Sequence, residues 1–116
     1  MKCNATEQMI NILLEDSIIN NAVNGEIRPV VARYGAAVPY VVVSNENTEV
    51  RRSKMGAVVG TTSDVLLTIV TDSYEELRII VDRITAIEGR LFKAVSYKED
   101  YGDEKYVALI NVNIEL

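Results

Sequence analysis

Histidine is absent from the sequence, and this absence excludes several kinds of catalytic site. Without an imidazole there is no Ser–His–Asp or Cys–His nucleophile system and no histidine general base that titrates near neutral pH. A zinc site built on thiolates is excluded as well, because Cys3 is the one cysteine. We therefore expect no catalytic, cofactor-binding or metal-binding residue, and a protein that is not an enzyme.

Cysteine, proline and glycine are all scarce. The lone Cys3 cannot form an intrachain disulfide, which fits a reducing compartment such as the cytosol. With 6 Gly and 2 Pro the chain has no signature of disorder or of collagen. The N-terminal segment is amphipathic and interrupted by Asn11, Glu15 and Asp16, so we expect neither a signal peptide nor a membrane span.

The chain has 116 residues, of which 48% are hydrophobic and 25% charged. These values predict one globular domain, residues 1–116, with a core large enough to fold without crosslinks. There are 12 Lys and Arg against 17 Asp and Glu, which gives a formal net charge of -5. An acidic surface does not displace counterions from nucleic acid, so this balance argues against sequence-independent nucleic-acid binding.

Two segments show helical periodicity. Residues 5–22 carry an apolar stripe that ends before Asn24 and Gly25, residues that tolerate the left-handed conformation at a helix end. The stripe consists of Met9, Ile10, Leu13, Leu14 and Ile18. A second helix should begin at Ser73, because Ser73-Tyr74-Glu75-Glu76 is a capping box, and should stop at Gly89. Its stripe consists of Leu77, Ile80, Val81, Ile84 and Ile87.

Five segments read as strands. Pro29 cannot donate a ladder hydrogen bond, so residues 26–34 should form an edge strand. The β-branched run 38–43 is typical of a central strand buried on both faces. Alternation predicts strands over 63–72, with Val65, Leu67 and Ile69 on one face, and over 105–116. A further strand is expected over 91–98. The strands 26–34 and 105–116 are expected to leave sheet edges that a loop covers or another subunit pairs with.

Residues 45–60 lack a clear period. A long structureless segment inside a small domain is uncommon and usually functional, so we expect a protruding loop or hairpin here. It carries three cations in four residues, which suits contact with an acidic partner surface or a phosphate backbone, although short basic stretches are often only solvated. Its candidate residues for partner or subunit contact are Glu49, Arg51, Arg52 and Lys54.

Other polar groupings fit structural roles. The acidic residues Glu99, Asp100, Asp103 and Glu104 have the wrong spacing for an EF-hand and are interpreted as a solvated hairpin turn. Gly60-Thr61-Thr62 lacks the lysine of a phosphate-binding loop and precedes a strand. The element order is helix, two strands, long loop or arm, strand, helix, two strands. It predicts an α+β fold: a two-layer sandwich of a mostly antiparallel sheet with two helices packed on one face.

The whole pattern is similar to the small tail-terminator, or tail-completion, proteins of long-tailed bacteriophages and prophages. The resemblance covers nearly the entire chain and includes the strand Pro39-Tyr40-Val41-Val42-Val43 and the sequence Thr71-Asp72-Ser73-Tyr74-Glu75-Glu76. It implies a structural virion protein that forms a homo-oligomeric ring, typically a hexamer, on the finished tail tube and presents a surface to the head-completion complex.

The resemblance also sets expectations for partners and location. The partners would be the tail-tube protein and the head-completion protein, and DNA would only pass through the lumen, where negative charge prevents sticking. No membrane partner and no cofactor are implied. The protein would occupy the host cytoplasm during assembly and then the virion tail. The alternatives are a small bacterial α+β ligand-binding or regulatory module and, last, an enzyme that uses carboxylates among Asp64, Asp72, Asp100 and Asp103.

Overall fold

The structure is a computed structural model that describes residues 5–30, 38–89 and 92–115. Cys3 and residues 31–34, on which predictions were made, lie outside the described residues. The elements in chain order are α1 (Ala5–Glu15), α2 (Ser17–Val23), β1 (Ile27–Pro29), β2 (Tyr40–Arg52), β3 (Val58–Thr71), α3 (Tyr74–Ile87), β4 (Phe92–Gly102) and β5 (Lys105–Glu115). Among the described helices, none is long and apolar enough to cross a membrane.

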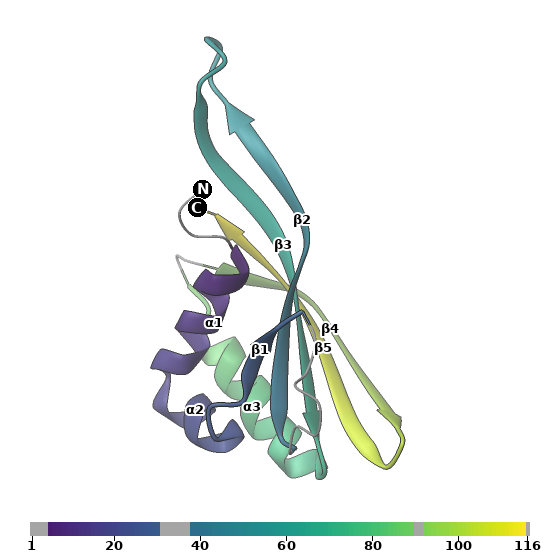
Figure 1. The fold of residues 1–116 in the computed structure, drawn as a ribbon. Helices are drawn as coiled ribbons and strands as arrows, with labels where there is room; N and C mark the ends of the chain where they lie inside the picture. The colour runs from purple at the N-terminus through teal and green to yellow at the C-terminus, as the bar shows by residue number, and fades with distance from the viewer. Residues whose placement is uncertain (1–4, 31–37, 90–91, 116) are drawn as a thin grey trace.

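The five strands form one sheet in the order β1-β2-β3-β5-β4, with the helices on one of its faces (Figure 1). β1 runs parallel to β2 and the other neighbours are antiparallel. The predicted α+β sandwich is therefore confirmed. The prediction for the C-terminal strand was wrong in one respect: β5 pairs on both sides, so the sheet edges are β1 and β4.

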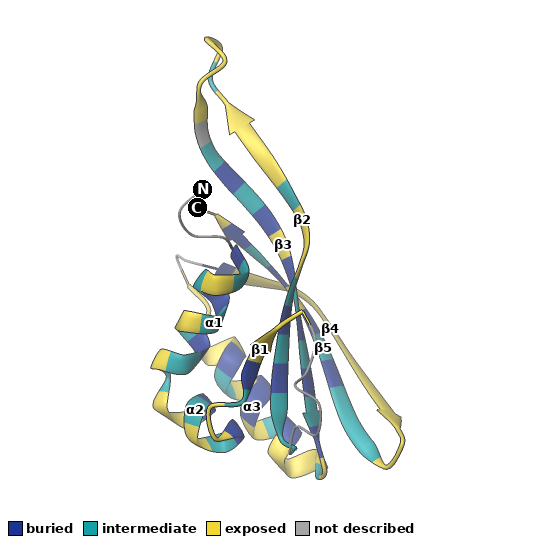
Figure 2. Ribbon diagram, viewed as in Figure 1, coloured by how far each residue is buried: buried dark blue, intermediate teal, exposed yellow. Residues whose placement is uncertain are grey.

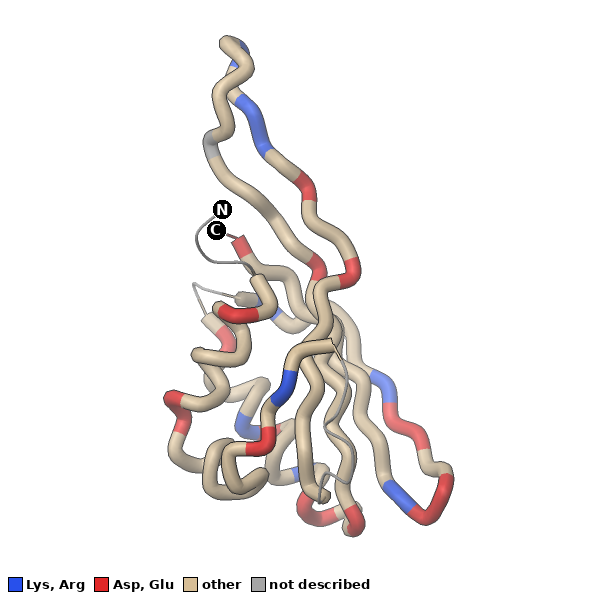
Figure 3. Tube along the Cα trace, in the orientation of Figure 1, with Lys and Arg blue, Asp and Glu red and all other residues tan. Residues whose placement is uncertain are grey.

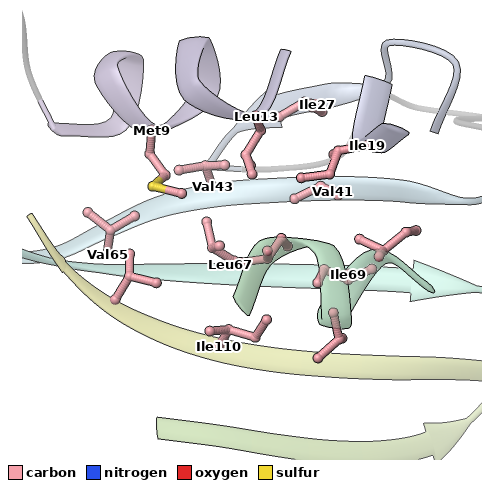
Figure 4. Packing of buried hydrophobic residues seen from close by; sticks show 14 of the residues in the cluster. Met9, Leu13, Ile19, Ile27, Val41, Val43, Val65, Leu67, Ile69 and Ile110 are labelled. Atoms are coloured by element: carbon pink, nitrogen blue, oxygen red, sulfur yellow. The ribbon is translucent and has the colours of Figure 1, made fainter. Parts of the chain in front are cut away.

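The core lies between the helices and one face of the sheet (Figures 2 and 4). Alternate residues of β3, namely Val65, Leu67 and Ile69, are fully buried there, as the period of two predicts. Facing them are the apolar stripes of the helices, which include Met9, Leu13, Ile19, Val23, Leu77, Ile80 and Ile84.

The predicted first helix is divided into two by Asp16. This residue has an extended backbone, and its carboxylate accepts a hydrogen bond from the Ile19 amide at 3.1 Å, which caps α2. The break changes the phase of the apolar stripe. Ile19 is therefore buried in place of Ile18, which is 47% exposed, and the expectation that Ile18 joins the stripe was wrong. The predicted exit is confirmed, since Asn24 is the left-handed C-cap of α2.

The second helix begins as predicted. The Ser73 hydroxyl accepts from the Glu76 amide at 3.2 Å, and α3 buries Leu77, Ile80, Val81 and Ile84 while Ile87 is half-buried. The run at 38–43 is not buried on both faces, however. Val41 and Val43 are buried, whereas Val42 is half-buried, because all three helices lie on the other face of the sheet.

Candidate interaction surfaces

The segment 45–60 forms the outer part of a long antiparallel hairpin made by β2 and β3. We call residues 46–60 the arm. It extends beyond the rest of the sheet and lengthens the molecule, whose principal extents are 53 × 29 × 25 Å (Figure 1). Within the arm, no described side chain is buried (Figure 2). The arm is thus a paired but unpacked ribbon, which is at best marginally stable by itself in water.

A β-bulge separates the arm from the packed part of the hairpin. The register of β2 against β3 shifts between Asn45 and Asn47. Asn45 stabilises the bulge, since its side chain accepts from the Asn47 amide at 3.1 Å and donates to Thr48 Oγ1 at 2.7 Å. A hydroxyl–hydroxyl hydrogen bond of 2.8 Å then joins Thr48 to Ser63 on β3. Because a bulge bends a strand and increases its twist, this bulge helps to set the direction in which the arm leaves the sheet.

The candidate contact residues from the sequence all lie on the arm. Glu49 pairs with Thr62 and Arg51 with Gly60, which places these two on one face of the ribbon. Arg52 and Lys54 are at the tip, where the guanidinium of Arg52 donates to the carbonyl of Gly56 at 2.9 Å. Gly56 has φ +86°, a conformation that favours glycine.

The tip combines positive charge with exposed apolar side chains. Its three cations, Arg51, Arg52 and Lys54, lie farther out than the arm's carboxylates, Glu46 and Glu49 (Figure 3). Beside them, the exposed fractions of Val50, Met55 and Val58 are 48%, 93% and 57%. Cations and apolar groups presented together suit a protein partner with an acidic rim and an apolar floor.

The second surface is β4, the long edge strand. After its first residue, Phe92, every residue of β4 is exposed. Among the described strands, β4 pairs only with β5, and no residue of β4 after Phe92 is buried by the helices. Such an edge is a template for association unless something covers it.

A polar cluster connects α3 to β4, with the carboxylate of Glu99 at its centre. Glu99 accepts hydrogen bonds from Tyr97 and, at 3.1 Å, from Tyr74. Arg78 donates to Glu99 at 3.3 Å, to Tyr97 at 3.1 Å and to Asp82 at 2.7 Å. The cluster orders side chains that would otherwise rotate freely on an exposed strand.

The same contacts shift the pKa values of the cluster. Partial desolvation, followed by the hydrogen bond to Glu99, raises the pKa of Tyr97 to about 12. The hydrogen bond from Tyr97 is the main cause that lowers the pKa of Glu99. At neutral pH the phenol is therefore protonated and the carboxylate charged, so the cluster is a fixed hydrogen-bond network rather than a proton-transfer pair.

The acidic residues 99–104 do not form the predicted turn. Glu99 and Asp100 belong to β4, and only Asp103 and Glu104, both with positive φ, make the two-residue connection to β5. Over residues 5–30, 38–89 and 92–115, no three or more Cys, Asp and Glu side chains gather in a way that would hold a metal ion.

The sequence prediction missed the Glu99 cluster. The spacing of Tyr97, Glu99 and Tyr101 placed these residues on one face of a strand, which was a usable signal. Nothing in the spacing indicated that Arg78 and Tyr74, about twenty residues earlier, would meet that face.

Comparison with known proteins adds one likeness. No protein-family model matches the sequence, and no curated protein matches it. Among solved structures, the fold resembles a chain in the virion of a native gene transfer agent particle, with a TM-score of 0.66 over 92% of each chain. The two sequences are 17% identical, so what they share is the fold.

Proposed function

We propose that this chain is a structural protein of a phage-like tail, which forms a ring that caps the tail tube and joins it to the head-completion complex. The observation that carries the proposal is the likeness, over 92% of both chains, to a chain of a gene transfer agent virion. The resemblance of the sequence to tail-terminator proteins supports the same function. The ring would contain about six subunits.

The distribution of exposed strands favours assembly. Both the arm and β4 expose strand residues that the single chain does not cover. A protein that acts alone usually blunts such strands, whereas a subunit of a ring covers them with its neighbours. The net charge of -5 suits a lumen through which DNA slides without sticking.

In this function the arm contacts a neighbouring subunit or the tube. Glu49, Arg51, Arg52 and Lys54 would form its polar contacts. The protein would act without catalysis and without a cofactor, first in the host cytoplasm during assembly and then in the virion tail.

A shortened arm tests the proposal. Val50 pairs with Thr61, so replacing residues 51–60 with Asn-Gly closes the hairpin by a two-residue turn. The midpoint of thermal unfolding should change little, because no described side chain in the removed segment is buried. Light scattering and negative-stain images should show rings for the parent chain, and the variant should fail to cap tubes of the same particle's tail-tube protein.

The matched control is a single substitution in an arm of full length. Substituting Lys54 by Arg preserves the charge at the tip and should retain capping. Normal capping by the shortened variant would refute the role of the arm, and failure of the parent chain to cap tubes or form rings would refute the proposed function.

A further inference from the structure

A groove runs between α3 and the edge strand β4. Its volume is about 780 Å³. Arg78 and Asp82 line it from α3, and Glu88 lines it from just beyond the end of that helix. Val95 and Tyr97 of β4 and Ile110 of β5 complete the lining. The groove lies between side-chain contacts that join the two walls, from Arg78 to Tyr97 and from the Ala94 amide to the Glu88 carboxylate. Every residue of β4 after Phe92 is exposed (Figure 2).

The walls of the groove are apolar and acidic. Val95, the extra residue of a β-bulge, is 68% exposed, and Tyr97 is 44% exposed. The charged residues that line the groove are Asp82, Glu88 and Arg78, and the guanidinium of Arg78 is already paired with Asp82 and with Glu99, which lies outside the lining. The groove therefore attracts a segment that combines apolar side chains with positive charge.

The tip of the arm is such a segment. It offers Met55 and Val58 as apolar groups and the cations of Arg51 and Lys54, which form no ion pair with the described residues. A tip cannot enter the groove of its own chain while the ladder from Thr48 to Arg52 is paired with β3, since that pairing holds the arm outward (Figure 1). Any groove that it reaches belongs to another molecule.

We propose that the tip of the arm of one copy docks into the α3–β4 groove of a second copy. The contact joins two unlike surfaces and leaves one tip and one groove free in a pair, so it propagates until the copies close a ring. The inference deepens the proposed function by naming the surface that receives the arm, and it rests on that function only for the closure of the ring.

Directed crosslinking tests the contact. The parent chain is first changed by Cys3→Ser, and single cysteines are then placed at the tip, Met55→Cys, or in the groove, Val95→Cys. A short bismaleimide should join the two variants when they are mixed. In a chain that carries both cysteines it should give a ladder of oligomers. Thr85→Cys on the α3 wall serves as a second acceptor if Val95→Cys disturbs β4.

Two controls test whether the crosslinking is specific to the groove and whether it depends on charge. Ile18, 47% exposed on α2, does not line the groove, so Met55→Cys with Ile18→Cys should give at most background crosslinking. Adding Arg51→Glu and Lys54→Glu to the tip should lower the yield on the order of tenfold by setting like charges against the acidic wall. Higher salt should also lower the yield of the parent pair.

The outcomes separate this inference from the proposed function. The docking is overturned if Met55→Cys crosslinks to neither Val95→Cys nor Thr85→Cys, or if it crosslinks to Ile18→Cys with the same yield. This holds even if images show rings that cap tubes. Efficient crosslinking in a chain that never caps a tube retains the docking and overturns the tail function instead.

Discussion

The two halves of the β2–β3 hairpin have the same backbone pairing but differ in what covers them. In the inner half, Val41 and Val43 of β2 and Leu67 and Ile69 of β3 are fully buried beneath the helices. Beyond the bulge at Asn45, no described side chain of residues 46–60 is buried, although Ser63 and Thr61, which pair with Thr48 and Val50, still are. Hydrogen bonds alone stabilise a ribbon weakly, since water competes for them. The comparison indicates that the inner half maintains the fold, whereas the arm contributes little to the buried core.

The largest expected effect is in the inner half. Leu67→Ala removes a fully buried side chain from β3 and should lower the free energy of unfolding by about 2–5 kcal/mol, because it loses apolar burial and leaves a cavity. Urea denaturation of the parent and variant chains measures the difference. A loss below about 0.5 kcal/mol would mean that the packed half does not maintain the fold.

The next effect concerns a charge in the packed part. Asp16 caps α2 and pairs with Arg83 of α3 at 2.8 Å. Asp16→Ala should lower the free energy of unfolding by about 1–2 kcal/mol at neutral pH through loss of the cap and ion pair. Glu49→Ala on the arm is the matched control and should have almost no effect.

The effect of Asp16 should depend on pH. The hydrogen bond from Arg83 is the main cause that lowers the pKa of Asp16 below its ordinary 3.8. A carboxyl group whose pKa is lower in the folded than in the unfolded chain stabilises the folded state. The contribution is complete when the pH is above the pKa of the unfolded chain, and it is lost as the pH falls through the pKa of the folded chain. The difference between parent and Asp16→Ala chains should therefore shrink on acidification. A constant difference would assign the effect to packing alone.

Sequence patterns predicted the covered parts of the molecule better than the uncovered parts. Alternation at Val65, Leu67 and Ile69 identified the buried face, and the Ser73 capping box identified the start of α3, because both signals are local. Residues 46–60 showed no apolar period of two because none of their described side chains is buried. Pro29 marked β1 as an edge strand, but the place of β5 between β3 and β4 was missed, because nothing in the composition of β5 distinguishes an inner strand from an edge strand.

Of the two candidate surfaces, the sequence indicated the arm but not the groove. The cations of the arm were recognisable as a local run, so Arg51, Arg52 and Lys54 were selected from the sequence. The groove forms only because α3 and β4 lie next to each other in the fold. No sequence pattern around Asp82 or Val95 predicts that arrangement. The break at Asp16 was also missed, because the apolar spacing of the first helix continues almost unchanged across it.

A substitution at the boundary between the two halves of the hairpin should have an intermediate effect on the free energy of unfolding. Thr48→Ala removes the hydrogen-bond partner of Ser63, whose side chain is buried, and should lower the free energy of unfolding by about 1 kcal/mol. The double variant Thr48→Val with Ser63→Ala removes both hydroxyls and should recover most of that loss. The matching single variants are Thr48→Val and Ser63→Ala. If the double variant loses as much free energy of unfolding as these two single variants added together, the hydrogen bond is not what stabilises the boundary.

The smallest effect on stability is expected at the tip. Met55→Ser changes a side chain that is 93% exposed, so the free energy of unfolding of the isolated chain should stay within about 0.5 kcal/mol of the parent value. The same change removes the most exposed apolar group that the arm offers a neighbour, so light scattering at equal concentrations should show fewer oligomers. Unchanged unfolding with weaker association would sharpen the contrast between the halves. A loss of stability comparable to that of Leu67→Ala would abolish the contrast, because the arm would then belong to the folding core.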